Sequence, residues 1–233
     1  MKKITFTLVP EDEDIPKEYY PIPAEKNIPK WYKAMKSYYD TKNGFQKRET
    51  ETIKRCMPVF DAFTAGYFIV LHTAISISYD ENKMLVINWA QDTKDTISFH
   101  AGYQLVGYKG LDLPQGAPKL RNPWGIKTPK GYSCFFMPPV HRENIGIRIL
   151  EGYVDTDIYT NAVNFPFLID EGFEGDIPAG TPIAQVIPFK RDNFKMEIGG
   201  IEERNHIAQI HRKMHTVWIN SYRTLFRQEK HYK

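Results

Sequence analysis

Residues 151–191 read EGYVDTDIYTNAVNFPFLIDEGFEGDIPAGTPIAQVIPFKR, and this stretch decides the fold class. Glycines, acids and short apolar runs alternate along it. Residues 153–154 and 164–169 have the composition of short strands, residues 177–181 form a Pro/Gly turn, and residues 182–187 form a strand that leaves the turn. The order predicts an antiparallel β-unit.

The same pattern continues towards the N-terminus. Further strands are predicted at residues 4–9, 67–71, 74–79, 84–89, 96–99, 124–126, 132–137 and 145–150. Parallel strands would need crossover helices between these segments, and the sequence has no helical pattern there. We therefore expect a mainly β fold, an antiparallel β-barrel or sandwich.

The segments outside this core have a different composition. Residues 19–39 are rich in proline and aromatic side chains, which predicts an irregular N-terminal segment with one helical turn at residues 29–35. Residues 58–63 could form another helical turn, and the polar residues 42–54 are expected to form an exposed connector. Within residues 90–123, the predicted strand at 96–99 is followed by an expected Gly/Pro-rich loop that runs through Pro118.

The C-terminal tail has helical periodicity. Apolar side chains recur at three- and four-residue spacing and predict one amphipathic helix over residues 203–227: Ile207, Ile210, Met214, Val217, Trp218, Tyr222 and Leu225. This stripe can pack on the β core or dock on a partner. We expect part of it to cross a subunit interface, with Trp218 and Tyr222 as anchors. The expected domains are residues 1–57, 58–191 and 192–233.

Composition excludes several classes of protein. The 233 residues include only two cysteines, Cys56 and Cys134, which rules out a disulfide framework or a four-thiolate zinc site. A formal net charge of +3 gives no indication of direct DNA binding. No apolar run reaches the roughly 20 residues of a transmembrane helix, and the N-terminus lacks a signal-peptide apolar segment. These features predict a cytosolic protein with no membrane association.

Four short motifs resemble the deoxyuridine triphosphatase (dUTPase) and deoxycytidine triphosphate deaminase superfamily, which has the β-clip fold. They lie at residues 64–67 (TAGY), 128–132 (TPKGY), 152–155 (GYVD) and 180–185 (GTPIAQ). The resemblance covers roughly residues 58–190. It implies a dUTPase-like β-barrel in which Asp155 stands where the family keeps the carboxylate that orients the attacking water.

The motifs that resemble the family are those of its scaffold, whereas most of its catalytic residues have no counterpart in this sequence. Phe68 stands where the family has an aspartate, and residues 137–140 (MPPV) replace its phosphate-binding Arg-Ser pair. The helical tail replaces the family's glycine-rich segment that covers the phosphates. Pyrophosphate hydrolysis needs several acids to hold magnesium, which Asp155 alone cannot supply. No cofactor is therefore expected, and magnesium only if the chain is a hydrolase.

A ligand site could still persist between the second and third motifs. The resemblance places it where Asp155, Tyr159, His141 and Arg142 converge, with Arg148 as a further phosphate donor. The alternative is that residues 140–144 form a solvated loop.

Two other groups of polar residues have the spacing of a site. His206, His211 and His215 lie one helical turn apart, but the tail offers no converging carboxylate, so we expect no metal. Asp155 and Asp157 alternate along a strand and share a face, as an acid pair requires, although such pairs more often cap a turn.

The whole chain also resembles a family of uncharacterised proteins of tailed bacteriophages, in residues 28–35 (IPKWYKAM), 56–67 (CMPVFDAFTAGY) and 122–136 (NPWGIKTPKGYSCFF). This resemblance implies a location in the host cytoplasm or the virion. The leading hypothesis is a non-enzymatic virion or assembly component that forms a homo-oligomer or binds other phage proteins. The alternative is a nucleotide-directed protein, either a divergent pyrophosphatase or a binder that sequesters a nucleotide or nucleotide second messenger.

Overall fold

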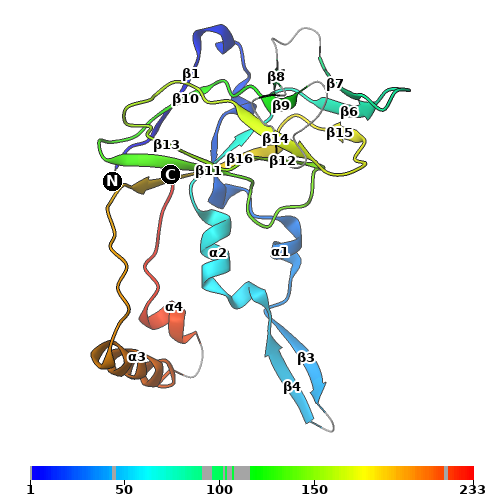
Figure 1. Ribbon diagram of the computed structural model, residues 1–233. Helices are drawn as coiled ribbons and strands as arrows, with labels where there is room; N and C mark the ends of the chain where they lie inside the picture. Colours follow the sequence, from blue (N-terminus) through cyan, green and yellow to red (C-terminus); the bar gives the residue numbers. More distant parts are fainter. Residues whose placement is uncertain are drawn as a thin grey trace. The chain divides into compact units, whose positions relative to one another are not determined.

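The computed structural model describes residues 2–43, 46–90, 96–101, 103, 107, 116–217 and 220–233. The chain divides into two compact units, and each consists of segments remote in sequence (Figure 1). Unit 1 comprises Met1–Ala24 and Gly66–Arg191, and unit 2 comprises Glu25–Ala65 and Asp192–Lys233. Residues 25–65, which the sequence assigned to an N-terminal extension and the start of the core, thus associate with the C-terminal residues.

Unit 1 is built from antiparallel strands. Its largest sheet has the order β13-β11-β16-β5-β2, and the others are β12-β14-β9-β8, β15-β6-β7 and β1-β10. The strands are β1 Thr5–Leu8, β2 Ile22–Pro23, β5 Tyr67–Val70, β6 Ile75–Tyr79, β7 Leu85–Trp89, β8 Ile97–His100, β9 Ala117–Leu120, β10 Trp124–Lys127, β11 Tyr132–Met137, β12 Ile147–Ile149, β13 Gly152–Val154, β14 Phe165–Ile169, β15 Gly175–Ile177 and β16 Pro182–Lys190. The predicted mainly β, antiparallel fold is confirmed.

Alternation of side chains produces the core of unit 1. Along β6 and β14, alternate residues point inwards, and the buried set includes Ile75, Ile77, Phe165 and Phe167. β5 is buried on both faces, with Ile69 in this core and Phe68 and Val70 in a smaller cluster. Phe167 is fully buried, as are Leu120 of β9 and Val186 of β16. The sheets therefore share one apolar cluster, which fixes the register of each strand because a slip by one residue would turn the apolar set outwards.

Gly66 marks a point where two strands approach too closely for a side chain. Its φ of +70° lies in the left-handed region, and a Cβ at this position would meet the Val186 carbonyl group and lie 3.1 Å from the Ile187 Cα. The residue precedes β5, which pairs with β16. The glycine of the sequence motif at residues 64–67 is thus required by packing.

Unit 2 contains the helices and one polar hairpin (Figure 1). Its elements are α1 Lys30–Ala34, β3 Tyr38–Asn43, β4 Gln46–Glu51, the 3-10 helix η4 Ile53–Arg55, α2 Met57–Thr64, α3 Ile201–Met214 and α4 Ser221–Leu225. Phe63 of α2 is fully buried, with its ring 4.6 Å from that of Tyr32 and 5.6 Å from that of Trp31. Of the three further 3-10 helices, η1 Pro10–Asp12 and η2 Lys17–Tyr19 belong to unit 1, and η3 Ala24–Lys26 spans the boundary between the two segments.

Two predictions of local structure are wrong. Residues 42–54 are not a connector, because β3 and β4 pair as a hairpin. Ala117–Leu120 forms β9 inside the predicted Gly/Pro-rich loop. In each case backbone pairing with a neighbouring strand outweighs an unfavourable local composition.

The predicted helix over residues 203–227 is two helices. α3 ends at Met214, and α4 begins at Ser221 after Asn220, whose φ of 60° and ψ of 33° are left-handed. Asparagine tolerates this conformation better than most residues, and a residue with these dihedral angles cannot lie inside a regular right-handed helix. A C-terminal amphipathic helix is present, but its apolar stripe does not continue through residue 227.

Candidate functional site

The two carboxylates that the sequence singled out lie where three strands end. Asp155 and Asp157 follow β13, and the register of β11 with β13 pairs Cys134 with Val154. The register of β11 with β16 pairs Ser133 with Phe189 and brings Arg191 next to Gly131. The strand ends thereby gather Ser133, Asp155, Asp157 and Arg191, which we call the aspartate–arginine cluster.

Arg191 is the centre of this cluster. Its Nη1 and Nη2 atoms donate to the two oxygens of Asp157 at 2.7 and 2.6 Å, and Nη1 also donates to Ser133 Oγ at 2.9 Å. Nη1 lies 3.2 Å from Asp155 Oδ1, which in turn accepts a 2.6 Å hydrogen bond from the Ser133 hydroxyl. A bidentate pair of this kind fixes the guanidinium plane as well as its position.

The electrostatics of the two acids differ. The hydrogen bonds from Arg191, followed by the Gly131 N–H at 2.7 Å, lower the pKa of Asp157 to about 2. The hydrogen bond with Asp157 raises the pKa of Arg191 in return. The Asp157 side chain is only 4% exposed, whereas that of Asp155 is 58% exposed. Asp157 is therefore a structural anion, and Asp155 is the acid that faces solvent.

The cluster ties strands together better than it performs acid–base chemistry. A carboxylate that activates water should have a pKa near neutrality, whereas the pKa of Asp157 is lowered to about 2. The Asp155 carboxylate is already bound by the Ser133 hydroxyl and Arg191. Cys134 beside them is buried, and burial raises its pKa to about 11 against the lowering effect of a hydrogen bond from Thr156. This supports the prediction that Cys134 is a packing residue and no nucleophile.

The structure separates the four residues of the predicted ligand site into two groups. Asp155 and Tyr159 share one turn, in which the Tyr159 N–H donates to the Asp155 carbonyl at 2.8 Å. His141 and Arg142 lie beyond the opposite end of β11, where the Val140 N–H donates to Gln185 Oε1 at 3.0 Å. The four strand steps from Ser133 to Met137 alone span about 13 Å, so the predicted convergence does not occur.

Arg142 has a packing role at its end of β11. Its guanidinium carbon lies 4.8 Å from the centre of the Phe68 ring, as in a cation–π contact. Burial lowers the pKa of Arg142 to about 10. His141 and Arg148 are exposed, and Arg148 lies in β12. Phe68 is fully buried beneath this arginine.

The predicted histidine group is on α3. The rings of His211 and His215 are 4.7 Å apart, and both residues are exposed. Over the part of the chain that the structure describes, no three His, Cys, Asp or Glu residues gather as a metal site would require. Of the two predicted interface anchors, Tyr222 is 41% exposed, and Trp218 lies outside the described residues.

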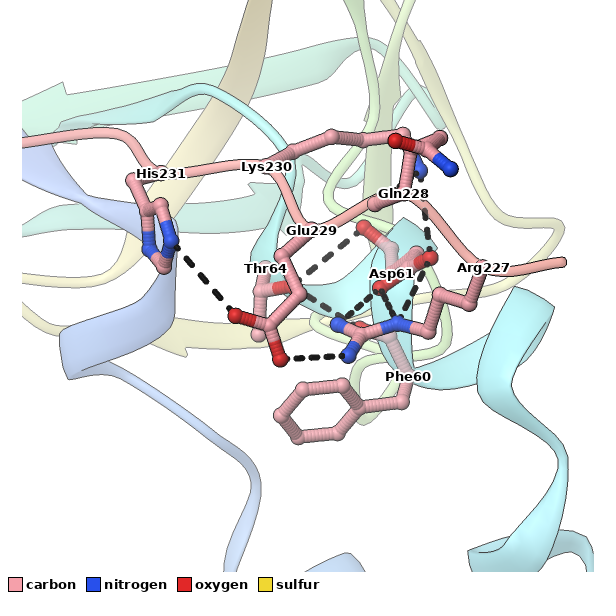
Figure 2. A network of polar contacts seen from close by, with 8 residues as sticks. All are labelled: Phe60, Asp61, Thr64, Arg227, Gln228, Glu229, Lys230 and His231. Atoms are coloured by element: carbon pink, nitrogen blue, oxygen red, sulfur yellow. Dashed lines mark hydrogen bonds and ion pairs between the residues drawn. The ribbon is translucent and has the colours of Figure 1, made fainter. Parts of the chain in front are cut away.

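Sequence reasoning missed a second charged cluster, in unit 2. Asp61 of α2 accepts hydrogen bonds from Arg227 at 2.7 and 3.1 Å and from Lys230 at 3.3 Å (Figure 2). Burial would raise the pKa of Asp61, but these hydrogen bonds outweigh it and lower the pKa. Figure 2 also shows Glu229 between Arg227 and His231. The C-terminal residues are thus bound to a helix that lies 166 positions earlier in the chain.

The region from the end of β16 to α3 exposes an unusual amount of apolar surface. Residues 192–200, which we call the arm, have no helix or strand assignment, and Figure 1 draws them as an extended trace. Phe194, Met196 and Ile198 are 92%, 87% and 92% exposed. Ile201 and Ile207 of α3 follow at 67% and 65%. The alternation of residues 193–198 was a signal in the sequence that could have identified this surface.

Comparison with family models and with curated proteins finds no match to this chain. None of the helices in the described ranges has both the length and the apolar composition that a membrane crossing needs.

Proposed function

We propose that this chain is a non-enzymatic assembly protein of the bacteriophage type. It would use a degenerate dUTPase-like β scaffold and associate through its C-terminal region into a homo-oligomer or with other phage proteins, in the virion or the host cytoplasm. The observation that carries this proposal is the exposed apolar surface of the arm and α3.

The amount of that surface supports association. Monomeric proteins rarely expose contiguous apolar patches larger than a few hundred Å². The five apolar side chains from Phe194 to Ile207 are each at least 65% exposed within 14 successive residues. Exposure of this apolar surface to water is unfavourable, and a partner that covers the segment would lower the free energy.

A second apolar surface lies on the largest sheet of unit 1. Tyr153 of β13 is 70% exposed, and its ring stacks on that of Phe135 at 4.6 Å and meets that of Phe189 at 5.4 Å. Exposed aromatic clusters are typical of the centres of protein interfaces. The sheet thus offers contact area in addition to the arm.

Light scattering of the intact chain tests the proposal. We expect a mass that is a multiple of 27.2 kDa. Ile207→Asp should weaken self-association about a hundredfold, because each of two copies loses roughly 1.5 kcal/mol of apolar burial. Gln209→Asp, on another side of α3, is the matched control and should leave the mass unchanged. A chain that is monomeric at all concentrations and binds no other protein of the same phage would contradict the proposal.

The competing candidate is a nucleotide-directed protein, and one observation favours it. Asp155 and Tyr159 share a turn and are 58% and 50% exposed, which leaves a carboxylate and a ring available to a ligand. Against it, Arg191 and Ser133 already bind Asp155.

We expect the purified protein with magnesium to release no pyrophosphate from deoxynucleoside triphosphates above a buffer blank. Asp155 is held by Arg191 and Ser133, and Phe68 and residues 137–140 lack the groups that the chemistry needs. The measurement is phosphate release with added inorganic pyrophosphatase, repeated for Asp155→Asn. Turnover in the intact chain that Asp155→Asn abolishes would replace the assembly proposal by the hydrolase.

A further inference from the structure

The arm has two chemically different sides. Phe194, Met196 and Ile198 are apolar and almost completely exposed, and the residues between them are polar. Lys195 Nζ lies 2.9 Å from Glu197 Oε1, an ion pair between side chains two positions apart. Side chains at i and i+2 share a side only where the backbone is extended. The arm is thus an extended segment whose sequence alternates between apolar and polar residues.

Such a segment normally pairs with a strand. Among the described residues, none of the strand pairings includes residues 192–200. An extended segment of this composition presents backbone N–H and C=O groups together with an apolar face, which is a template for pairing with another chain. Strand addition is one of the recurring modes of protein recognition.

We propose that the arms of two copies of this chain pair with each other as an antiparallel two-stranded ribbon centred on Met196, an inference that rests on the proposed assembly function. The arm sequence selects this partner and this register. With Met196 on the two-fold axis, Lys195 lies opposite Glu197 of the partner subunit, and Phe194 lies opposite Ile198 of the partner subunit.

The other registers fail on charge or on polarity. Centring the ribbon on residue 195 places lysine opposite lysine, and centring it on residue 197 places glutamate opposite glutamate, which is destabilising for directly opposed side chains. A shift by one residue puts apolar side chains opposite charged ones. A parallel pair in register opposes like charges at both positions. The arm is therefore self-complementary in one antiparallel register.

α3 can cover the apolar face of this ribbon. A two-stranded ribbon is marginal in water unless another element packs on it. α3 begins two residues after Gly199, and its start is fixed by a 2.7 Å hydrogen bond from the Gly200 N–H to Glu203. Ile207, Ile210 and Met214 follow at helical spacing, with Ile207 65% exposed. Both copies supply such a helix, so the ribbon gains a cover from each.

Cysteine cross-linking tests the register. Residues directly opposite in an antiparallel pair have Cα atoms about 4.5–5.5 Å apart, within the roughly 4.4–6.8 Å that a disulfide spans. In a Cys56→Ser background, Met196→Cys should form a covalent dimer on mild oxidation, seen on a non-reducing gel. In Phe194→Cys or Ile198→Cys, the two copies of the new cysteine lie about 13 Å apart along the ribbon. Each of these variants alone should cross-link at least tenfold less than Met196→Cys, whereas a mixture of the two variants should cross-link efficiently.

Charge exchange gives an independent test. Lys195→Glu and Glu197→Lys should each weaken dimerisation about tenfold, because each substitution turns both cross-strand pairs of residues 195 and 197 into pairs of like charges. The double variant exchanges the two charges and should restore dimerisation. Equal cross-linking at all three positions, or no rescue in the double variant, with an oligomeric intact chain would overturn the arm pairing and leave the assembly function standing. A monomeric intact chain would overturn the arm pairing, and one that also binds no other protein of the same phage would overturn the assembly function as well.

Discussion

Gly66→Ala is expected to destabilise unit 1 by about 4 kcal/mol, because it combines backbone strain with overpacking of two paired strands. The φ of +70° disfavours any side chain, and the new methyl group would meet backbone atoms of Val186, which cannot move aside as a flexible side chain could. Urea denaturation followed by tryptophan fluorescence, to which the buried Trp124 of unit 1 contributes, measures the loss.

Two other glycines separate the two causes. Gly131 has a φ of +83° and open space around it, so Gly131→Ala should cost about 1–2 kcal/mol from strain alone. A methyl group at Gly152 meets no neighbour within 4 Å and no such strain, so Gly152→Ala should change stability by less than about 0.5 kcal/mol. Equal effects at the three positions would refute the packing role of Gly66.

Arg191→Gln is expected to return the pKa of Asp157 from about 2 towards the ordinary range of an aspartate. The guanidinium is the first cause of the lowered pKa, and glutamine lacks its charge and its bidentate geometry. Carboxyl-carbon NMR titration of Asp157 measures the change. Lys130→Gln, at an exposed lysine of the adjacent turn, is the control and should leave the pKa near 2.

The shifted pKa also sets a pH dependence of stability. Because the folded pKa of Asp157 lies below the value of about 3.9 in unfolded chains, its contribution is fully present above pH 4 and is lost as pH falls towards 2. The melting temperature of the intact chain should therefore fall more steeply than that of Arg191→Gln between pH 4 and pH 2. Parallel curves for the two proteins would contradict the assignment.

Most strands of unit 1 were predictable because an apolar composition coincides with a position between turn residues. Residues 67–71 and 132–137 are apolar runs between turn residues, and they form β5 and β11 nearly as expected. β9 was missed because a proline and a lysine, Pro118 and Lys119, are unusual in an inner strand, although Ala117 and Leu120 are buried. The β3–β4 hairpin was missed because its polar residues suggest a connector, although the Asn-Gly dipeptide at residues 43–44 of the sequence is a known hairpin signal.

The candidate site was predicted only in part. Asp155 and Asp157 could be singled out because they alternate on one strand, but Arg191 is 34 positions away from Asp157 and Ser133 is 22 positions from Asp155. Only the pairing of β11 with β13 and β16 brings them together. For the same reason the sequence could not show that β11 separates Asp155 from Arg142.

The division of unit 2 between two distant segments has a consequence for synthesis. Asp61 leaves the ribosome 166 residues before Arg227, and at about 5–20 residues per second this interval lasts roughly 10–30 s. During that time α2 lacks the cations that neutralise it, and residues 66–191 emerge and can fold. The last residues to be translated then complete the earlier segment, so a prematurely terminated polypeptide would have a finished unit 1 and an open unit 2.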